Sequence, residues 1–318
     1  MGSCLRWHAV VGLLLLPAIG WAQSEAKPQE TAAQFGAAAT QKWEFGVSIR
    51  ANGGPCNGLF GTFAVPADWP EQQVKVLSEE VTPQVVRHSY REGDGLKQML
   101  FEVPQLAAGD TASCYLTLEI TKRPQLPPAD TTGLVIPKDP PREVKKFLLP
   151  SPLVETSGAK VKSLAKELTA GKETAWEQVK AIAGGVRDRV RFEPDPKNIM
   201  KGATAALRDG KADKEDLTAT FVAICRAAKI PARIVWVMDF CYAEFYLTDA
   251  AGQGAWYPYV VHQSGELGAC KDVRPILEKG DNFKVPEEKA PQRFVREYLT
   301  GKGGGGKPSV EFRRRRAD

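Results

Sequence analysis

The chain has 318 residues, with 43 Lys and Arg against 38 Asp and Glu, and a formal net charge of +5. Four consecutive arginines, Arg313 to Arg316, account for most of this excess, so the folded body is close to neutral. This balance excludes a large basic face for nucleic acid, and three histidines exclude a histidine-rich metal site. We expect no nucleic-acid partner, no metal and no cofactor. The oligomeric state is left open.

The first residues have the pattern of a secretory signal peptide. Arg6 supplies a positive start, Ala9–Leu16 form a short apolar run, and a small-residue cleavage site ends at Ala22. The apolar run is shorter than the roughly 20 residues that a membrane-spanning helix needs. We therefore expect cleavage of residues 1–22, a secreted or periplasmic mature chain, and no transmembrane segment after cleavage.

The next two segments predict a flexible leader and a β-sandwich. Residues 23–41 are rich in Ala, Gln, Glu and Thr and lack apolar periodicity, which is typical of a leader. Residues 42–124 alternate apolar and polar side chains in short runs that turn residues separate, which predicts a sandwich. The expected strands are Lys42–Arg50, Gly61–Val65, Gln73–Leu77, Lys97–Val103 and Ser113–Thr121.

The second half of the chain changes character. Residues 125–147 are rich in proline, which breaks both ladders and helices and predicts a linker. Residues 148–300 then combine helical periodicity with strand patterns, so the whole fold class is α+β. Residues 301–318 are a glycine run and an arginine run, which predict a disordered tail. The expected helices are Val161–Leu168, Thr174–Val190, Ala203–Leu207 and Asp216–Ala228, and the expected strands are Arg233–Val237, Ala243–Thr248 and Trp256–Val261.

Five cysteines follow the leader, and their spacings fit no zinc pattern. In an oxidising compartment we expect two disulfides, Cys56–Cys114 and Cys241–Cys270. Cys225 would then be free, and it lies on the apolar stripe of an expected helix, so we expect it to be buried.

The segment 210–261 resembles the core of a transglutaminase-like domain. The family helix ends in R-A-x-x-I-P-A-R, and residues 226–233 read Arg-Ala-Ala-Lys-Ile-Pro-Ala-Arg. The family strand H-x-W-x-E is matched in its second half by Tyr242-Ala243-Glu244, and the later G-x-W by Gly254-Ala255-Trp256. The resemblance extends over residues 148–286. It implies a papain-like α+β domain with a cysteine, a histidine and an aspartate as catalytic residues.

The three catalytic positions of the family are changed in this chain. Counting from the matched motifs, the cysteine position is Lys214, the histidine position is Phe240 and the aspartate position is Val260. Asp213 is a good N-cap for a helix that begins at Lys214, so the helix start is intact without a nucleophile. We therefore expect a degenerate site with no catalytic residue. The residues that could line the former cleft are Asp213, Lys214, Asp216, Phe240, Cys241, Tyr242, Glu244 and Trp256.

Two functions follow from this pattern. The first is a pseudoenzyme that binds a protein or peptide partner through the former cleft or the β-sandwich, because the active relatives grip peptide side chains. The alternative is a cysteine-dependent acyl transferase, amidase or protease-like enzyme with a displaced nucleophile, for which Cys241 is the better candidate. A structural envelope component without a defined small ligand is a third interpretation. For His88 and His262, surface or structural roles are expected.

Overall fold

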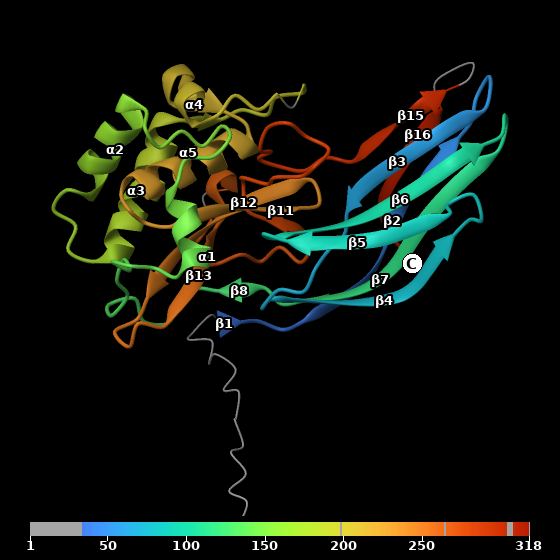
Figure 1. Cartoon of the computed structure of the whole chain (residues 1–318). Coiled ribbons are helices and arrows are strands. Elements are labelled where there is room, and N and C mark those ends of the chain that lie inside the picture. The colour runs from blue at the N-terminus through green and yellow to red at the C-terminus, as the bar shows by residue number, and fades with distance from the viewer. Residues whose placement is uncertain (1–33, 198, 264, 304–307, 318) are drawn as a thin grey trace, which may run out of the picture.

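The computed structural model describes residues 34–197, 199–263, 265–303 and 308–317, so the expected signal peptide lies outside the described residues. Figure 1 shows the helices at one end of the molecule and long strands at the other. The fold is α+β, as the sequence predicts. Among the described residues, no helix is long and apolar enough to cross a membrane.

The predicted β-sandwich is present. Its first sheet has the order β16-β2-β7-β4, and its second contains β5, β6, β3 and β15. Alternate residues of β7 from Ala112 to Ile120 are buried, because successive side chains of a strand point to opposite faces. The strands are β2 (Ala39–Arg50), β3 (Cys56–Ala64), β4 (Gln72–Val81), β5 (Arg87–Gly93), β6 (Leu96–Leu106), β7 (Thr111–Lys122), β15 (Tyr298–Gly303) and β16 (Ser309–Arg316).

The second sheet continues into the other half of the molecule. Its strand order is β13-β12-β11-β14-β6-β3-β15, and the pair Glu278–Leu96 joins β14 to β6. The strands on this side are β11 (Ala232–Val237), β12 (Phe240–Thr248), β13 (Gly254–Tyr259) and β14 (Ile276–Lys279). Both halves of the protein therefore share one sheet.

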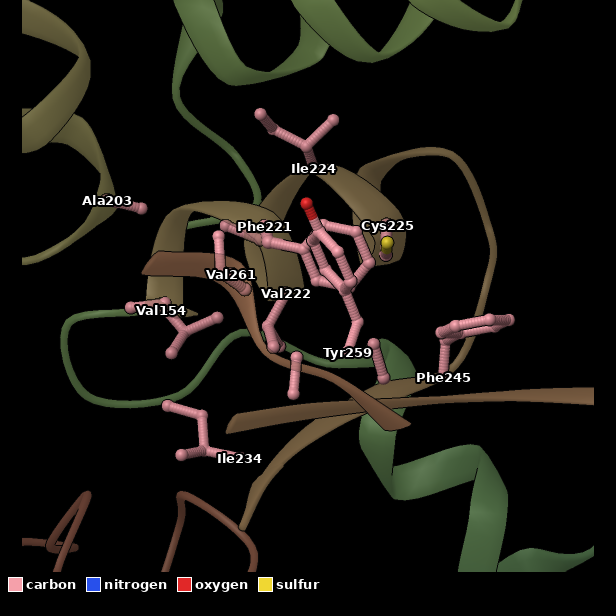
Figure 2. Packing of buried hydrophobic residues seen from close by; sticks show 14 of the residues in the cluster. Val154, Ala203, Phe221, Val222, Ile224, Cys225, Ile234, Phe245, Tyr259 and Val261 are labelled. Atoms are coloured by element: carbon pink, nitrogen blue, oxygen red, sulfur yellow. The ribbon is translucent and has the colours of Figure 1, made fainter. Parts of the chain in front are cut away.

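Helices cover one face of β11–β13. The central helix α5 (Lys214–Ala227) is buried from Glu215 to Arg226, and Figure 2 shows Phe221, Val222 and Ile224 of this helix among the buried side chains of its surroundings. Around it lie α2 (Ala159–Thr169), α3 (Ala175–Arg189) and α4 (Ala203–Asp209). Thr174 and Glu177 form a capping box at the start of α3. The shorter elements are β1 (Gln34–Phe35), β8 (Gln125–Leu126), α1 (Arg142–Lys145), η1 (Lys146–Leu148), β9 (Arg191–Phe192), β10 (Lys211–Ala212) and η2 (Val261–Gln263).

Two segments expected to be flexible are ordered strands. Strand β16 pairs with β2 over its whole length, from Ser309–Arg50 to Arg316–Trp43, so the expected disordered tail is wrong for these residues. Arg313 and Arg315 both pair with Glu44 on β2, which offsets their mutual repulsion. The end of the expected leader also belongs to strands, since β1 pairs with β8 and β2 begins at Ala39.

The expected disulfides are absent. All five cysteines of the described chain are free and buried, so the prediction is confirmed for Cys225 and wrong for the other four. The Cys114 thiol lies beside Met99, with their sulfur atoms 3.5 Å apart. Met99 is paired across the sheet with Phe63 of β3, and Cys56 lies seven residues before Phe63 on the same strand. Seven residues of an extended strand span about 23 Å, far beyond the reach of a disulfide.

The second expected pair is separated by a sheet. Cys241 lies in the core that faces α5, whereas Cys270 packs with Tyr242 and Val260 on the opposite face of β12. Spacing and compartment alone do not report which face of a strand a cysteine occupies.

Candidate functional site

The first turn of α5 lies at the position where the resemblance places the nucleophile. Asp213 is the N-cap, and its Oδ1 accepts a hydrogen bond of 2.9 Å from the Asp216 backbone N–H, as predicted. Lys214 is the first helical residue, and its side chain is 32% exposed. Its ammonium lies 3.7 Å from the carboxylate of Glu215. The helix start is therefore well formed and presents an amine rather than a thiol.

Asp216 ties α5 to the loop that precedes α4. Its carboxylate accepts hydrogen bonds from the backbone N–H groups of Lys201 and Gly202, at 2.8 and 2.9 Å. The buried guanidinium of Arg293 adds contacts of 3.2 and 3.3 Å to the same carboxylate. Asp216 is thus a structural anchor that is fully occupied by these donors.

Asp213 has a different environment. It is 6% exposed, and its Oδ2 has no hydrogen-bond partner among the described residues. Burial raises the pKa of Asp213 to about 6, and the negative charges of Glu215 and Asp216 add to this rise. The hydrogen bond from the Asp216 N–H and the charge of Arg293 lower the pKa but do not outweigh burial. Asp213 therefore retains a free acceptor oxygen at the start of α5.

Phe240 and Val260, at the expected histidine and aspartate positions, form part of one closed apolar cluster. They are 6% and 7% exposed and pack with Tyr242 and Ile276. The Arg274 guanidinium covers the Phe240 ring at 4.8 Å. Neither side chain can take up or hold a proton, so these two positions supply packing and no acid–base chemistry.

His262 is the site residue that sequence reasoning missed. It lies in η2, which packs against α5, and its ring contacts those of Phe240 and Phe192 at 5.3 Å each. Burial, together with the nearby charges of Lys214 and Arg274, lowers its pKa. The signal was its place two residues after Val260, but only the packing of η2 shows that it lies near Lys214.

The cysteine thiols are not poised for chemistry. Cys241 lies beneath the first turn of α5, and its sulfur contacts the Lys214 carbonyl at 3.8 Å and the Thr218 hydroxyl at 3.6 Å. Complete burial raises the pKa of its thiol to about 12, and the charge of Glu215 adds to this effect. Burial also raises the pKa of the Cys225 thiol, inside α5. Neither sulfur is a ready thiolate at neutral pH.

A pocket of about 170 Å³ opens beside the start of α5. Its lining includes Asp213 and Asp216 from the start of α5 and, from the segment before α4, Glu193, Pro194, Asp195, Pro196, Ile199 and Lys201. Ile199 in this wall and neighbouring Phe192 are large exposed hydrophobic side chains, 54% and 41% exposed. The charged side chains of the pocket are four acids against Lys201 and Lys211, so its lining is acidic overall, and Ile199 adds an exposed apolar side chain.

The remaining cleft candidates lie on the other face of the sheet. Glu244 on β12 is completely buried and binds Arg233 at 2.6 Å and Lys279 at 2.8 Å. Burial raises the pKa of Glu244, but these two cations outweigh that effect and lower it. The Arg233 guanidinium stacks on Trp256 at 4.0 Å, and Lys279 also binds Glu71 of the sandwich at 2.6 Å. Tyr242 packs on this face as well.

The candidates therefore fall into two groups. The first group lies at the start of α5 and consists of Asp213, Lys214, Asp216 and Cys241. Phe240 lies beside His262. Tyr242, Glu244 and Trp256 belong to structural packing and to a small cavity of about 110 Å³ next to the sandwich. Among the residues described by the structure, no group of three or more His, Cys, Asp or Glu side chains is placed to hold a metal ion.

Comparison with known proteins agrees with this fold. The model of the transglutaminase-like superfamily matches residues 162–260, so the chain contains a transglutaminase-like domain. The structure is similar to that of a candidate cysteine protease from Cytophaga hutchinsonii, with a TM-score of 0.58 and 15% sequence identity over 90% of this chain and 93% of that one. At this identity the likeness shows the fold alone.

Other matches are weaker. The periplasmic domain of TgpA from Pseudomonas aeruginosa has a TM-score of 0.36 and 13% identity over 73% of this chain and 94% of that one. The same domain bound to ethylmercury has a TM-score of 0.35 and 12% identity over 70% and 91%. None of the curated protein sequences compared with this chain matches it.

Proposed function

We propose that this protein is an exported, non-catalytic transglutaminase-like protein that binds a protein or peptide partner beside the start of α5. The observation that carries the proposal is the contrast between two neighbouring places. Phe240 and Val260, which the resemblance assigns to the family's histidine and aspartate positions, are buried in an apolar cluster, whereas a pocket next to Asp213 is open.

The chemistry of acyl transfer supports the loss of catalysis. It requires a nucleophile, a base that activates it and a group that orients the base. Lys214 is charged and lies beside Glu215, and Phe240 and Val260 have no ionisable group. The alternative, a displaced nucleophile at Cys241, requires a thiolate, and the buried Cys241 thiol has its pKa raised to about 12.

The pocket favours a peptide that carries a Lys or Arg side chain. The acids Glu193, Asp195 and Asp216 are occupied by basic side chains or backbone N–H groups, and Asp213 keeps an acceptor oxygen without a partner. Because that oxygen is enclosed, a ligand cation would be attracted by the charge of the Asp213 carboxylate without bonding to this atom, and the exposed Ile199 of the lining would pack against a neighbouring apolar side chain.

Catalysis is tested by assaying deamidation, amine incorporation and peptide hydrolysis with the purified mature protein. We expect no turnover by the wild type. Clear turnover that is abolished by Lys214→Ala or Cys241→Ala would overturn the proposal in favour of the cysteine enzyme.

Binding is tested with a library of short peptides and the Asp213→Asn variant. Asparagine also caps helices well, so the fold should be retained while the charge is lost. We expect enrichment of peptides with a Lys or Arg next to an apolar residue, and weaker binding by Asp213→Asn. Glu173→Gln, an exposed residue before α3, is the control that should bind as the wild type does. Equal binding by both variants would contradict the proposed site.

The exported location rests on the leader sequence. N-terminal sequencing of the natively produced protein should give Gln23 as the first residue. An intact Met1 in the mature fraction would contradict cleavage.

A further inference from the structure

A second groove lies between α3, the proline-rich segment and the loop that follows η2. It has a volume of about 350 Å³. Four residues of α3, at spacings of four, three and four, form one wall: Trp176, Lys180, Ala183 and Arg187. Side chains at these spacings share one face of a helix. The opposite wall comes from the proline-rich segment at Pro127 and Pro128 and from the loop Gly265 to Leu267.

The wall of α3 carries two cations without acidic partners. Neither Lys180 nor Arg187 forms an ion pair with any residue that the structure describes, whereas Arg189, two residues further on, pairs with Glu167 at 2.5 Å. The loop contributes one acid, Glu266, which is exposed. The charged side chains of the groove therefore sum to +1.

The lining of the groove includes a buried polar group next to Arg187. Tyr259 is 1% exposed, and its ring packs against Phe221 of α5 at 5.0 Å, an arrangement that Figure 2 shows. Its hydroxyl is buried, and the Arg187 side chain lies within hydrogen-bonding reach of it. The Arg187 guanidinium is near enough to oppose the rise that burial causes in the pKa of Tyr259. This contact holds the guanidinium beside the groove, and the guanidinium has five N–H donors, so donors remain for an anion.

Trp176 supplies a rigid apolar wall. Its indole meets the rings of Phe245 and Tyr257 edge to face, at 5.5 and 5.6 Å. A side chain added at Gly268 would come within 2.8 Å of both Trp176 and Pro128, so this glycine allows the indole and the proline segment to approach. The indole is thus fixed in place before any ligand arrives.

We propose that this groove binds a small organic anion, a carboxylate whose aromatic or apolar body packs on Trp176 and whose charge is met by Lys180 and Arg187. The volume suits a molecule of this size, because small-molecule sites usually occupy roughly 300–1,000 Å³. An apolar wall with a few convergent donors is the usual composition of such sites. The site does not depend on the proposed peptide partner.

Three probes of one shape and different charge test the proposal: phenylacetate, phenylacetamide and phenethylamine. Binding to the mature protein is followed by ligand-observed NMR at millimolar concentration. We expect phenylacetate to bind about tenfold or more tightly than the amide, in line with a charge-assisted hydrogen bond, and the amine not to bind. Glu266→Gln should tighten the binding of phenylacetate by removing the like charge.

Matched variants locate the site. Lys180→Gln with Arg187→Gln should lose at least about tenfold in affinity for phenylacetate. Lys162→Gln with Lys166→Gln, two exposed residues of α2 that lose the same charge, should bind as the wild type does. Equal binding of the anion and the amide, an equal loss in both double variants, or no binding of phenylacetate by the wild type would each overturn the proposal.

Discussion

The rings of Phe240 and His262 meet edge to face, with their centroids 5.3 Å apart. The His262 imidazole is also in contact with Phe192, and its Nδ1 is buried without a partner among the described residues. A histidine therefore does lie near the former nucleophile position, but it is held by aromatic contacts and comes from a different element than the family's histidine.

The variant Lys214→Cys should show no acyl-transfer activity. It places a thiol at the start of α5, but Phe240 gives that thiol no base. The triple variant Lys214→Cys, Phe240→His and Val260→Asp is the comparison, with turnover measured by deamidation and peptide hydrolysis. Turnover by Lys214→Cys alone would mean that His262 can act as the base, and would contradict our account of its aromatic contacts.

The five cysteines of the mature chain should be unreactive in the folded protein. All are buried, and burial raises the pKa of Cys241 to about 12, of Cys114 to about 12 and of Cys270 to about 11. A maleimide should label none of them rapidly at neutral pH and all five in guanidinium chloride. Peptide mapping without reduction should find no disulfide. Fast labelling of Cys241 in the native state would support the displaced-nucleophile alternative.

Glu278→Gln should stabilise the protein at alkaline pH. Glu278 is completely buried on β14, and burial raises its pKa from 4.5 to about 8 despite a hydrogen bond from the Val295 N–H and the charge of Arg314. The folded state holds this proton more tightly than the unfolded state, so the stability it contributes is present below pH 4.5 and is lost as the pH rises to about 8.

The free energy of unfolding of the wild type should therefore fall across this pH range, relative to the variant. Denaturant titrations at pH 5 and pH 9 measure the difference. We expect near equality at the lower pH and an advantage on the order of a few kcal/mol for Glu278→Gln at the higher one. A difference that does not change with pH would show that Glu278 does not titrate in this way.

Arg226→Met should destabilise the fold by about 3–5 kcal/mol, the usual result of leaving a buried carboxylate unpaired. The Arg226 guanidinium donates two hydrogen bonds of 2.7 and 2.8 Å to the Asp281 carboxylate, and both side chains are 1% exposed. Thermal unfolding measures the loss. The double variant Arg226→Met with Asp281→Asn removes the stranded charge and should recover part of it. A double variant no more stable than the single one would argue against this pairing.

Deletion of residues 309–318 should lower the melting temperature and promote aggregation. The deletion removes β16 and leaves the edge of β2 unpaired, and exposed strand edges recruit other chains. It also removes Phe312, which packs against the sandwich core. The control replaces Arg313 to Arg316 with glutamine and keeps the backbone ladder, so its effect should be smaller. Similar behaviour of the two variants would mean that the arginine charges, rather than the strand, matter.

Local features of the fold were predictable from the sequence. Asp213 as a helix cap and the spacing of α3 and α5 depend on neighbouring residues, and the structure has them as expected. The matched motif was also informative, because Arg226, Arg233 and Glu244 all form buried ion pairs. These residues of the motif therefore have a structural role in this chain.

Features that depend on distant pairing were not predictable. The disulfides failed because the face on which Cys241 and Cys270 lie depends on which elements cover each side of β12. The C-terminal strand was not predicted because four consecutive arginines repel one another, which favours disorder. In the fold, Glu44 of β2 lies beside them and offsets that repulsion. The position of His262 near Lys214 depends on how η2 packs against α5, which the sequence does not indicate.

The position of the last strand sets an order of events in folding. Strand β2 is among the first described parts of the chain, but its partner β16 ends at Arg316, paired with Trp43. The first sheet thus cannot gain its outer strand until residues 309–316 have been synthesised, more than 250 residues after β2. Contacts between such distant residues slow folding, because a long loop must close before any of them forms. Until then, a nascent or translocating chain would expose the unpaired edge of β2. Exposed strand edges recruit other chains, so a chaperone that covers this edge would prevent aggregation during that period.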